Sequence, residues 1–113
     1  MRKVYICAPL GGEIALNVER AKQYARFVLK KCGAASVVPH FYALLLDDTQ
    51  PEEREMGRNA AKALLWFCDE CWVFGDEITS GMREEIELCR HLNIKVRYIS
   101  EREIKKTIGG VTI

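Results

Sequence analysis

The strongest constraint on the fold is a regular alternation of short apolar runs with longer segments of helical periodicity. The runs are rich in β-branched and aromatic residues, and glycine, proline or a polar turn stops most of them, as is typical of buried strands. They cover Lys3–Ala8, Ala35–Val38, Glu70–Gly75 and Ile94–Ile99. Because strands that alternate with helices are joined by crossovers, we expect a mostly parallel sheet with helices on both faces.

Helical patterns fill the intervals between these runs. The first is Glu13–Cys32, followed by Gly33 as a C-terminal stop, and the third is Gly81–Leu92. A capping-box pattern with proline in the first turn, Thr49-Gln50-Pro51-Glu52, opens the second helix. Its apolar stripe is predicted to consist of Met56, Ala60, Leu64 and Phe67.

The C-terminal region and one internal segment complete the pattern. A second capping box, Ser100–Glu103, opens a short last helix that Gly109-Gly110 ends, and Val111–Ile113 is a candidate fifth strand. The apolar segment His40–Leu46 is ambiguous between helix and strand. We therefore expect a flavodoxin-like α/β three-layer sandwich with four to five strands, formed by residues 1–113 as a single domain.

Composition excludes several classes of protein. The net charge is only +1, and no basic stripe with interleaved aromatic residues indicates a nucleic-acid polymer as partner. The longest apolar run, Phe41–Leu46, is too short to span a membrane, and the N-terminus lacks the pattern of a signal peptide. Five cysteines, an odd number set mostly in apolar patterns, favour reduced buried thiols and a cytoplasmic protein. Cys68-Asp-Glu-Cys71 falls at a helix end, which favours structural thiols over a redox pair.

The expected architecture places a ligand site before any family is considered. In parallel sheets, ligands bind beyond the carboxyl ends of strands where the strand order reverses, which in the order 2-1-3-4-5 lies between the first and third strands. The loops there are Ala8-Pro9-Leu10-Gly11-Gly12 and Gly75 to Gly81. Both contain glycine and both lead into helices, so we expect them to border one cleft.

The third helix carries three glutamates, of which one stands apart. Glu85 falls on the apolar face with Met82 and Cys89, whereas Glu84 and Glu87 project to the opposite side. A carboxylate on an apolar face is costly unless it is used or paired. Two interpretations remain open: Glu85 is a catalytic carboxylate, or it is a first-turn acid that interacts with the helix terminus or with a buried arginine.

Several motifs together resemble a known family. They are Val4 to Leu10, Pro39-His40, Leu46-Asp47-Asp48, Glu53-Arg54 and Trp72 to Glu85. This pattern, which covers most of the chain, resembles the nucleoside 2-deoxyribosyltransferase-like superfamily, which includes the 2′-deoxynucleoside 5′-phosphate N-hydrolases. The similarity is to an uncharacterised bacterial and phage branch.

The resemblance implies a function and a set of site residues. Glu85, in the motif Gly81 to Ile86, matches the nucleophile that attacks the anomeric carbon of a deoxyribosyl group. Tyr5, the loop Ala8 to Gly12 and His40 correspond to sugar and base contacts; Gly75 borders the site; Ser80, Gly81 and Met82 form its phosphate end. The resemblance implies a nucleoside or nucleotide substrate, hydrolysis or transfer without metal or cofactor, and a homo-oligomer.

Each of these residues also has an interpretation without a ligand. His40 is equally explained as a loop histidine with no role, and Tyr5 by strand packing. Ser80 is also a candidate N-cap, a role that is compatible with phosphate binding. The segment Phe41–Leu46 and Trp66 raise a third possibility, a structural subunit, although such a segment is more often core than interface.

One departure from the family pattern bears on catalysis. Characterised members carry an acidic residue where this chain has Ala61. Asp47, Asp48 or Glu55 are candidate substitutes, although loop solvation and helix capping explain the two aspartates as well. The loss of the acid favours the alternative function, a module that binds a nucleotide or nucleotide signal without turning it over.

Overall fold

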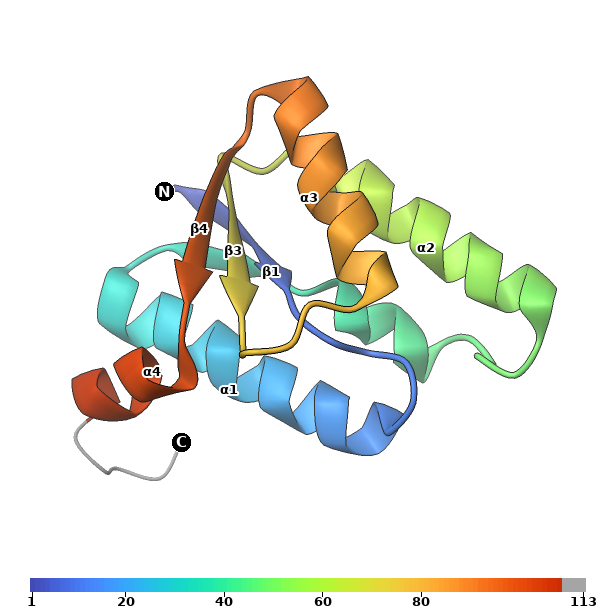
Figure 1. Ribbon diagram of the computed structural model, residues 1–113, viewed down its shortest axis with the longest axis horizontal. Coiled ribbons are helices and arrows are strands. Elements are labelled where there is room, and N and C mark those ends of the chain that lie inside the picture. The colour runs from blue at the N-terminus through green and yellow to red at the C-terminus, as the bar shows by residue number, and fades with distance from the viewer. Residues whose placement is uncertain (109–113) are drawn as a thin grey trace.

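Four parallel strands form the sheet of the computed structural model, which describes residues 1–108 (Figure 1). The strands lie in the order β2-β1-β3-β4. Their bounds are Lys3–Cys7 for β1, Ala35–Val37 for β2, Glu70–Phe74 for β3 and Lys95–Ile99 for β4. This order reverses between β1 and β3, as expected. The candidate strand Val111–Ile113 lies outside the described residues.

Helices cover both faces of this sheet (Figure 1). Helices α1 and α4 pack on one face, and α2 and α3 pack on the other. Their bounds are Ile14–Cys32 for α1, Pro51–Leu65 for α2, Ser80–Leu92 for α3 and Glu101–Ile108 for α4, and a 3-10 helix, η1, covers Pro39–Leu44. The predicted flavodoxin-like three-layer α/β fold with a parallel sheet is confirmed. None of the helices in residues 1–108 has the length and hydrophobicity needed to span a membrane.

The sheet separates two apolar layers because side chains alternate along each strand. Toward α1 and α4 the layer is largely aliphatic and aromatic: Val4, Ile6, Tyr24, Phe27, Trp72, Phe74, Ile99 and Ile104 belong to it. Toward α2 and α3 it is rich in thiols: Tyr5, Cys7, Leu65, Cys68, Cys71, Met82, Ile86 and Cys89 belong to it. All five cysteines are free; Cys68 lies in the connection between α2 and β3, and Cys71 lies on β3.

The packing of α2 differs from the prediction. Met56 and Phe67 are 57% and 76% exposed, whereas Leu65 is fully buried. Phe67 lies beyond Leu65, the last residue of α2, and the Leu46 side chain comes close to the same helix at Gly57. The predicted capping box is also wrong: Gln50 is the N-cap without a side-chain bond, since the Thr49 hydroxyl donates to Asp47 instead (2.6 Å).

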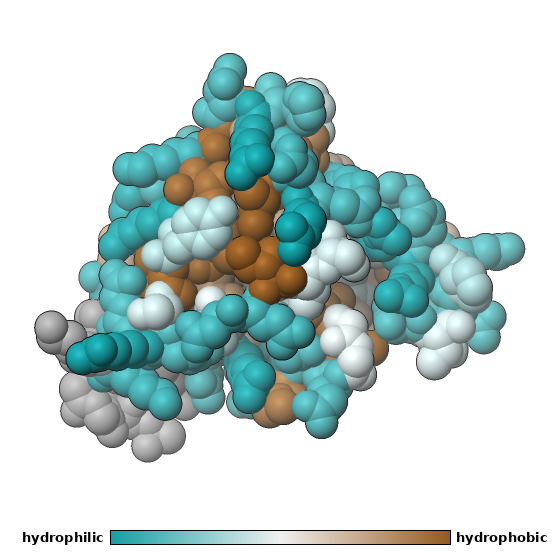
Figure 2. Space-filling model, in the orientation of Figure 1, coloured by the Kyte–Doolittle hydropathy of each residue, from teal (hydrophilic) through white to brown (hydrophobic). Residues whose placement is uncertain are grey.

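The ambiguous segment after β2 forms η1 and lies largely at the surface. Phe41, Leu44 and Leu45 are all more than half exposed, so the expectation that this segment is core is wrong for these three. Hydrophilic side chains cover most of the face seen in Figure 2, and apolar ones reach its centre between α3 and α4.

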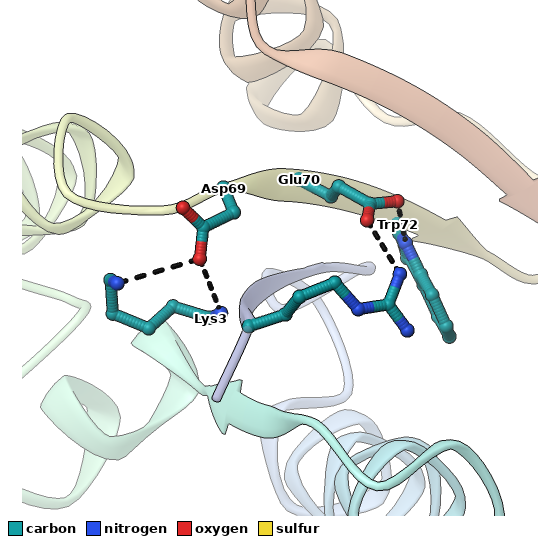
Figure 3. A network of polar contacts seen from close by, with 5 residues as sticks. Lys3, Asp69, Glu70 and Trp72 are labelled. Carbon is teal, nitrogen blue, oxygen red and sulfur yellow. Dashed lines mark hydrogen bonds and ion pairs between the residues drawn. The ribbon is translucent and has the colours of Figure 1, made fainter.

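Polar contacts fix the pairing of β1 and β3 at the amino ends of these strands (Figure 3). Lys3 donates its backbone N–H to Asp69 (2.7 Å), and its ammonium group lies 3.4 Å from the same carboxylate. Glu70 accepts from both Arg2 (2.6 Å) and the indole N–H of Trp72 (3.1 Å). The carboxyl ends of the two strands, where the cleft opens, are therefore free of these contacts.

Candidate active site

A cleft of about 250 Å³ lies at the carboxyl edge of the sheet. The loop after β1, the segment η1, one side of α2 and the first two turns of α3 enclose it. One side chain of α1 holds the loop after β1: the buried Asn17 donates to the carbonyls of Leu10 (3.0 Å) and Gly11 (3.2 Å). The expected convergence of the loops after β1 and β3 is confirmed for Ala8, Leu10 and Gly11 on one side and Thr79 to Met82 on the other.

Glu85 projects from α3 toward β1 and lines the cleft. Its Oε2 accepts a hydrogen bond from the Tyr5 hydroxyl, and its Oε1 accepts one from the Cys7 thiol at 3.6 Å. Burial raises the pKa of Glu85 to about 7, although both hydrogen bonds act in the opposite direction. The carboxyl group therefore exchanges its proton near neutral pH, which suits a catalytic acid, base or nucleophile.

The start of α3 forms one wall of the cleft. Thr79 is the N-cap, and its hydroxyl accepts from the backbone N–H of Met82 at 3.3 Å. Ser80 is therefore not the N-cap; it is the first residue of the helix, and it and Gly81 are exposed at the cleft. Backbone N–H groups at such a position, together with the helix dipole, favour an anionic ligand group.

His40 connects η1 to the loop after β1. Its Nε2 lies 3.1 Å from the Ala8 carbonyl and 3.2 Å from the Pro9 carbonyl, so this nitrogen carries the hydrogen. The ring is buried, and burial lowers the pKa of His40, which keeps it neutral. Nδ1 has no hydrogen-bond partner within the described part of the chain. His40 therefore holds the cleft loop in place, and the ring also lines the cleft.

Helix α2 contributes cations to the wall opposite Glu85. Arg58 binds the Glu84 carboxylate, and the Lys62 ammonium lies 3.5 Å from it. The expectation that Glu84 projects away from the cleft is wrong, because these two side chains draw it across the gap between the helices. Glu87 is exposed as expected and pairs with Arg90.

The acidic candidates near Ala61 separate into two groups. Ala61 and Asp48 line the cleft, as does Glu53 of the Glu53-Arg54 motif, which was not among the candidate substitutes. Asp47 instead accepts from Thr49, and Glu55 lines a neighbouring surface groove. Of the proposed substitutes for the missing acid, only Asp48 therefore lines the cleft.

The structure gathers most of the sequence-derived site residues into the cleft and leaves some outside it. Those that line it are Ala8, Leu10, Gly11, His40, Ser80, Gly81, Met82 and Glu85. Those that do not are Tyr5, Pro9, Gly12 and Gly75. Tyr5 nevertheless reaches the site through Glu85, and Pro9 through His40. Gly75 lies on the other side of the sheet, near the Tyr24 hydroxyl, and has a positive φ of 89°.

Other residues of the site were not singled out from the sequence. Asn17, Arg58, Lys62 and Thr79 belong to this group, and Cys7 was interpreted only as a structural thiol. Arg58 and Lys62 are four residues apart, which places both on one side of α2, but nothing in the sequence showed that this side faces the cleft. Within residues 1–108, no group of three or more His, Cys, Asp or Glu side chains is arranged to hold a metal ion.

Comparisons with known proteins agree with this architecture. Residues 2–99 match the model of a family described as a domain of unknown function (DUF7768). No curated protein sequence matches the chain. A 2-deoxyribosyltransferase from the psychrotolerant bacterium Bacillus psychrosaccharolyticus, described as a biocatalyst for nucleoside synthesis, has a similar structure. The TM-score is 0.67 at 20% sequence identity, over 87% of this chain and 72% of that chain. The fold is therefore nucleoside 2-deoxyribosyltransferase-like, as the sequence motifs implied.

Proposed function

The chain belongs to the DUF7768 family, and we propose that it cleaves or transfers the N-glycosidic bond of a deoxynucleoside or nucleoside monophosphate through Glu85. The observation that carries the proposal is the placement of this carboxylate, desolvated and held by two donors, in the wall of the cleft. The similar fold of a 2-deoxyribosyltransferase supports the same class of chemistry.

The proposed reaction proceeds in two balanced steps. A carboxylate oxygen of Glu85 attacks the anomeric carbon, the bond from that carbon to the base nitrogen breaks, and its electron pair leaves with the base, which takes up a proton. In the second step, water or a second base attacks the same carbon. The ester bond to Glu85 breaks and returns the carboxylate, and the attacking group releases its proton. Neither step requires a metal or an organic cofactor.

The walls of the cleft suggest how the substrate lies. We assign its 5′ or phosphate end to the start of α3, where the backbone N–H groups of Ser80 and Gly81 lie at the cleft. The loop after β1 and the ring of His40 then contact the sugar and base. Calorimetry that compares a nucleoside with its 5′-monophosphate tests this orientation, and equal affinities would contradict it.

A second candidate function is nucleotide binding without turnover. Ala61 lines the cleft at the place where related enzymes carry an acid, so protonation of the leaving base has no dedicated group there. Asp48 and Glu53 also line the cleft and are the carboxylates that could replace this acid. A chain that binds monophosphates tightly but releases no base would establish this alternative.

We also propose that the chain acts as a homo-oligomer. The elements η1 and α2 pack against each other. Large apolar side chains are exposed on these two elements and at their C-terminal ends: Phe41, Leu44, Leu45, Met56, Trp66 and Phe67. An aromatic side chain buries roughly 150–250 Å² in an interface, so three such side chains with their neighbours approach the area of a specific contact. Light scattering tests this; a monomer at micromolar concentration that Phe67→Glu leaves unchanged would contradict it.

The decisive test of the proposed function is turnover on a panel of deoxynucleosides and their monophosphates, with released base measured by mass spectrometry. Wild type, Glu85→Ala and Glu87→Ala form the comparison, because Glu87 lies on the same helix but faces solvent. We expect base release by wild type and by Glu87→Ala, and none by Glu85→Ala. Activity retained by Glu85→Ala would exclude Glu85 as the nucleophile.

A further inference from the structure

The two oxygens of the Glu85 carboxylate are held by two different residues of the same strand. Tyr5 donates to Oε2 and Cys7 approaches Oε1 at 3.6 Å. These residues are two positions apart on β1, so their side chains project to the same face of the sheet, and both are fully buried. Strand β1 thus presents two donors, one to each oxygen of the same carboxylate.

The Cys7 thiol has one hydrogen and two acceptors within reach. The Met82 carbonyl oxygen lies 3.9 Å from Sγ, farther than Oε1 of Glu85. A carboxylate oxygen is also the stronger acceptor, because a charged partner roughly doubles the strength of a hydrogen bond. The thiol hydrogen therefore points to Glu85 whenever that carboxyl group is ionised.

The thiol also remains a donor over the working pH range. A hydrogen bond from the neighbouring Cys71 lowers the pKa of Cys7, but burial and the Glu85 charge outweigh it and raise the pKa above its usual value. A neutral thiol has no charge that would repel the carboxylate. Cys7 is therefore suited to hold Glu85 and unsuited to react in its place.

Resting on the proposed function, we propose that Cys7 is a positioning residue for Glu85: its thiol fixes the second carboxylate oxygen, as Tyr5 fixes the first, and stabilises the negative charge required for attack. A single donor would leave the carboxylate free to rotate about its last bond. Two donors on one rigid strand hold its plane, which keeps the attacking oxygen in one position toward the cleft.

Other groups also act on Glu85, and the effect of Cys7 has to be separated from theirs. Burial and the Glu84 charge disfavour the ionised form, whereas Tyr5 and Lys62 favour it. The titratable and charged side chains that face Glu85 are Tyr5 and Cys7 from β1, Cys71 from β3, Glu84 and Cys89 from α3, and Lys62 from α2. Only Tyr5 and Cys7 donate directly to its oxygens in the described residues.

The experiment measures the protonation of Glu85 without depending on turnover. The side-chain carboxyl carbon of Glu85 is titrated by ¹³C NMR in wild type, Cys7→Ala, Cys7→Ser and Cys68→Ala, and is assigned with Glu85→Gln. Cys68 is the matched control, because its thiol lies in the same apolar layer but donates to the Leu64 carbonyl (3.4 Å).

We expect Cys7→Ala to raise the Glu85 midpoint by about 0.5–1 pH unit, as loss of one modest hydrogen bond to a charged group does. The hydroxyl of Cys7→Ser still donates, so its midpoint should equal or fall below that of wild type, and Cys68→Ala should not move it. The acid limb of the kcat/KM profile should shift by the same amount. Well above the raised midpoint, where Glu85 is ionised in every variant, kcat/KM of Cys7→Ala should remain several-fold below that of wild type, because the attacking oxygen has lost one of its two fixed positions, whereas Cys68→Ala should match wild type.

A midpoint that Cys7→Ala leaves unchanged would overturn the proposal. If Cys7→Ala does not fold, Cys7→Ser decides, because a raised midpoint in that variant would equally overturn it. A midpoint that shifts as expected in a protein that releases no base would refute the proposed function and leave the positioning role intact. The two failures are thus distinguishable.

Discussion

Each face of the sheet carries one tyrosine–glutamate hydrogen bond, and the two pairs differ in what surrounds them. Toward α1 and α4, Tyr24 donates to Glu101, its ring stacks on Phe74 at 4.6 Å, and Glu101 stands at the first position of α4. Toward α2 and α3, Tyr5 donates to Glu85 inside a layer of thiols, beneath a cleft. Similar chemical pairs therefore occupy a helix start on one face and a candidate active site on the other.

The difference lies in how much of the carboxylate the protein desolvates and how many donors reach it. Burial is the largest influence on the pKa of Glu85, which it raises to about 7, and two donors from β1 oppose it. Glu101 lies at a helix terminus, where the first-turn N–H groups favour an anion. We therefore propose the buried Glu85 at the cleft, and not Glu101 at its helix start, as the functional carboxylate.

The largest contrast is expected in activity. Glu85→Gln keeps the size of the side chain but removes the proposed nucleophile, so base release should fall by at least about 10³-fold, as losses of catalytic nucleophiles do. Glu101→Gln should leave kcat/KM within about twofold of wild type. Steady-state assays on the same nucleoside panel provide the measurement, and equal losses in both variants would erase the contrast.

A second contrast is expected in stability. Because the folded-state pKa of Glu85 is raised from an ordinary 4.5 to about 7, its contribution to folding is fully present below pH 4.5 and is lost as the pH rises through 7. This rise in the pKa of Glu85 changes the free energy of unfolding by at most about 3 kcal/mol. Glu85→Gln should therefore be more stable than wild type at pH 8, but not at pH 4.

Urea unfolding of wild type and Glu85→Gln at several pH values measures this difference in stability. A wild-type stability that stays constant between pH 4.5 and pH 7.5, with Glu85→Gln parallel to it, would show that Glu85 is not desolvated.

The tyrosines allow a finer comparison. Tyr5→Phe removes the donor to Oε2 of Glu85, so kcat/KM at pH 7 should fall by about tenfold, in line with one hydrogen bond to a charged group. Tyr24→Phe removes the corresponding bond to Glu101 and should not alter activity. Comparing the pH–rate profiles of the two variants tests whether the hydrogen bond from Tyr5 to Glu85 contributes to activity. Identical profiles for Tyr5→Phe and wild type would be incompatible with it.

The smallest expected effect concerns only the apolar layer between the sheet and helices α1 and α4. The Arg97 guanidinium lies 4.8 Å from the centre of the Trp72 ring, which is fully buried in that layer. Arg97→Ala should cost about 0.5–1 kcal/mol of stability through the lost cation–π contact. It should leave base release unchanged. Thermal unfolding and the turnover assay check both parts, and a loss of activity would show that this face is coupled to the cleft.

The sequence was sufficient for the architecture because each strand has a clear apolar signature and each crossover a helical one. The alternation predicted the parallel sheet, and the helical angle of Glu85 predicted its direction toward the β1 side of α3. These inferences rest on periodicities that the backbone imposes locally.

Inference from the sequence failed where a long-range contact decides the outcome. Met56 is exposed although it belongs to the predicted stripe, whereas Leu64 of that stripe packs on the core; Phe67 lies beyond Leu65, the last residue of α2. Glu84 lies across the cleft because Arg58 and Lys62 stand on a different helix. The angle between two helices, unlike the period of one, is not encoded in a local pattern.

The most direct test of the central claim is to identify the residue that carries the glycosyl group during turnover. Wild type is mixed with deoxynucleoside monophosphates, quenched in acid within milliseconds and analysed by peptide mass spectrometry. The account predicts one deoxyribosyl phosphate on Glu85, no adduct on Glu84 or Glu101, and no adduct at all in Glu85→Gln. An adduct on another residue, or turnover that persists in Glu85→Gln, would contradict it.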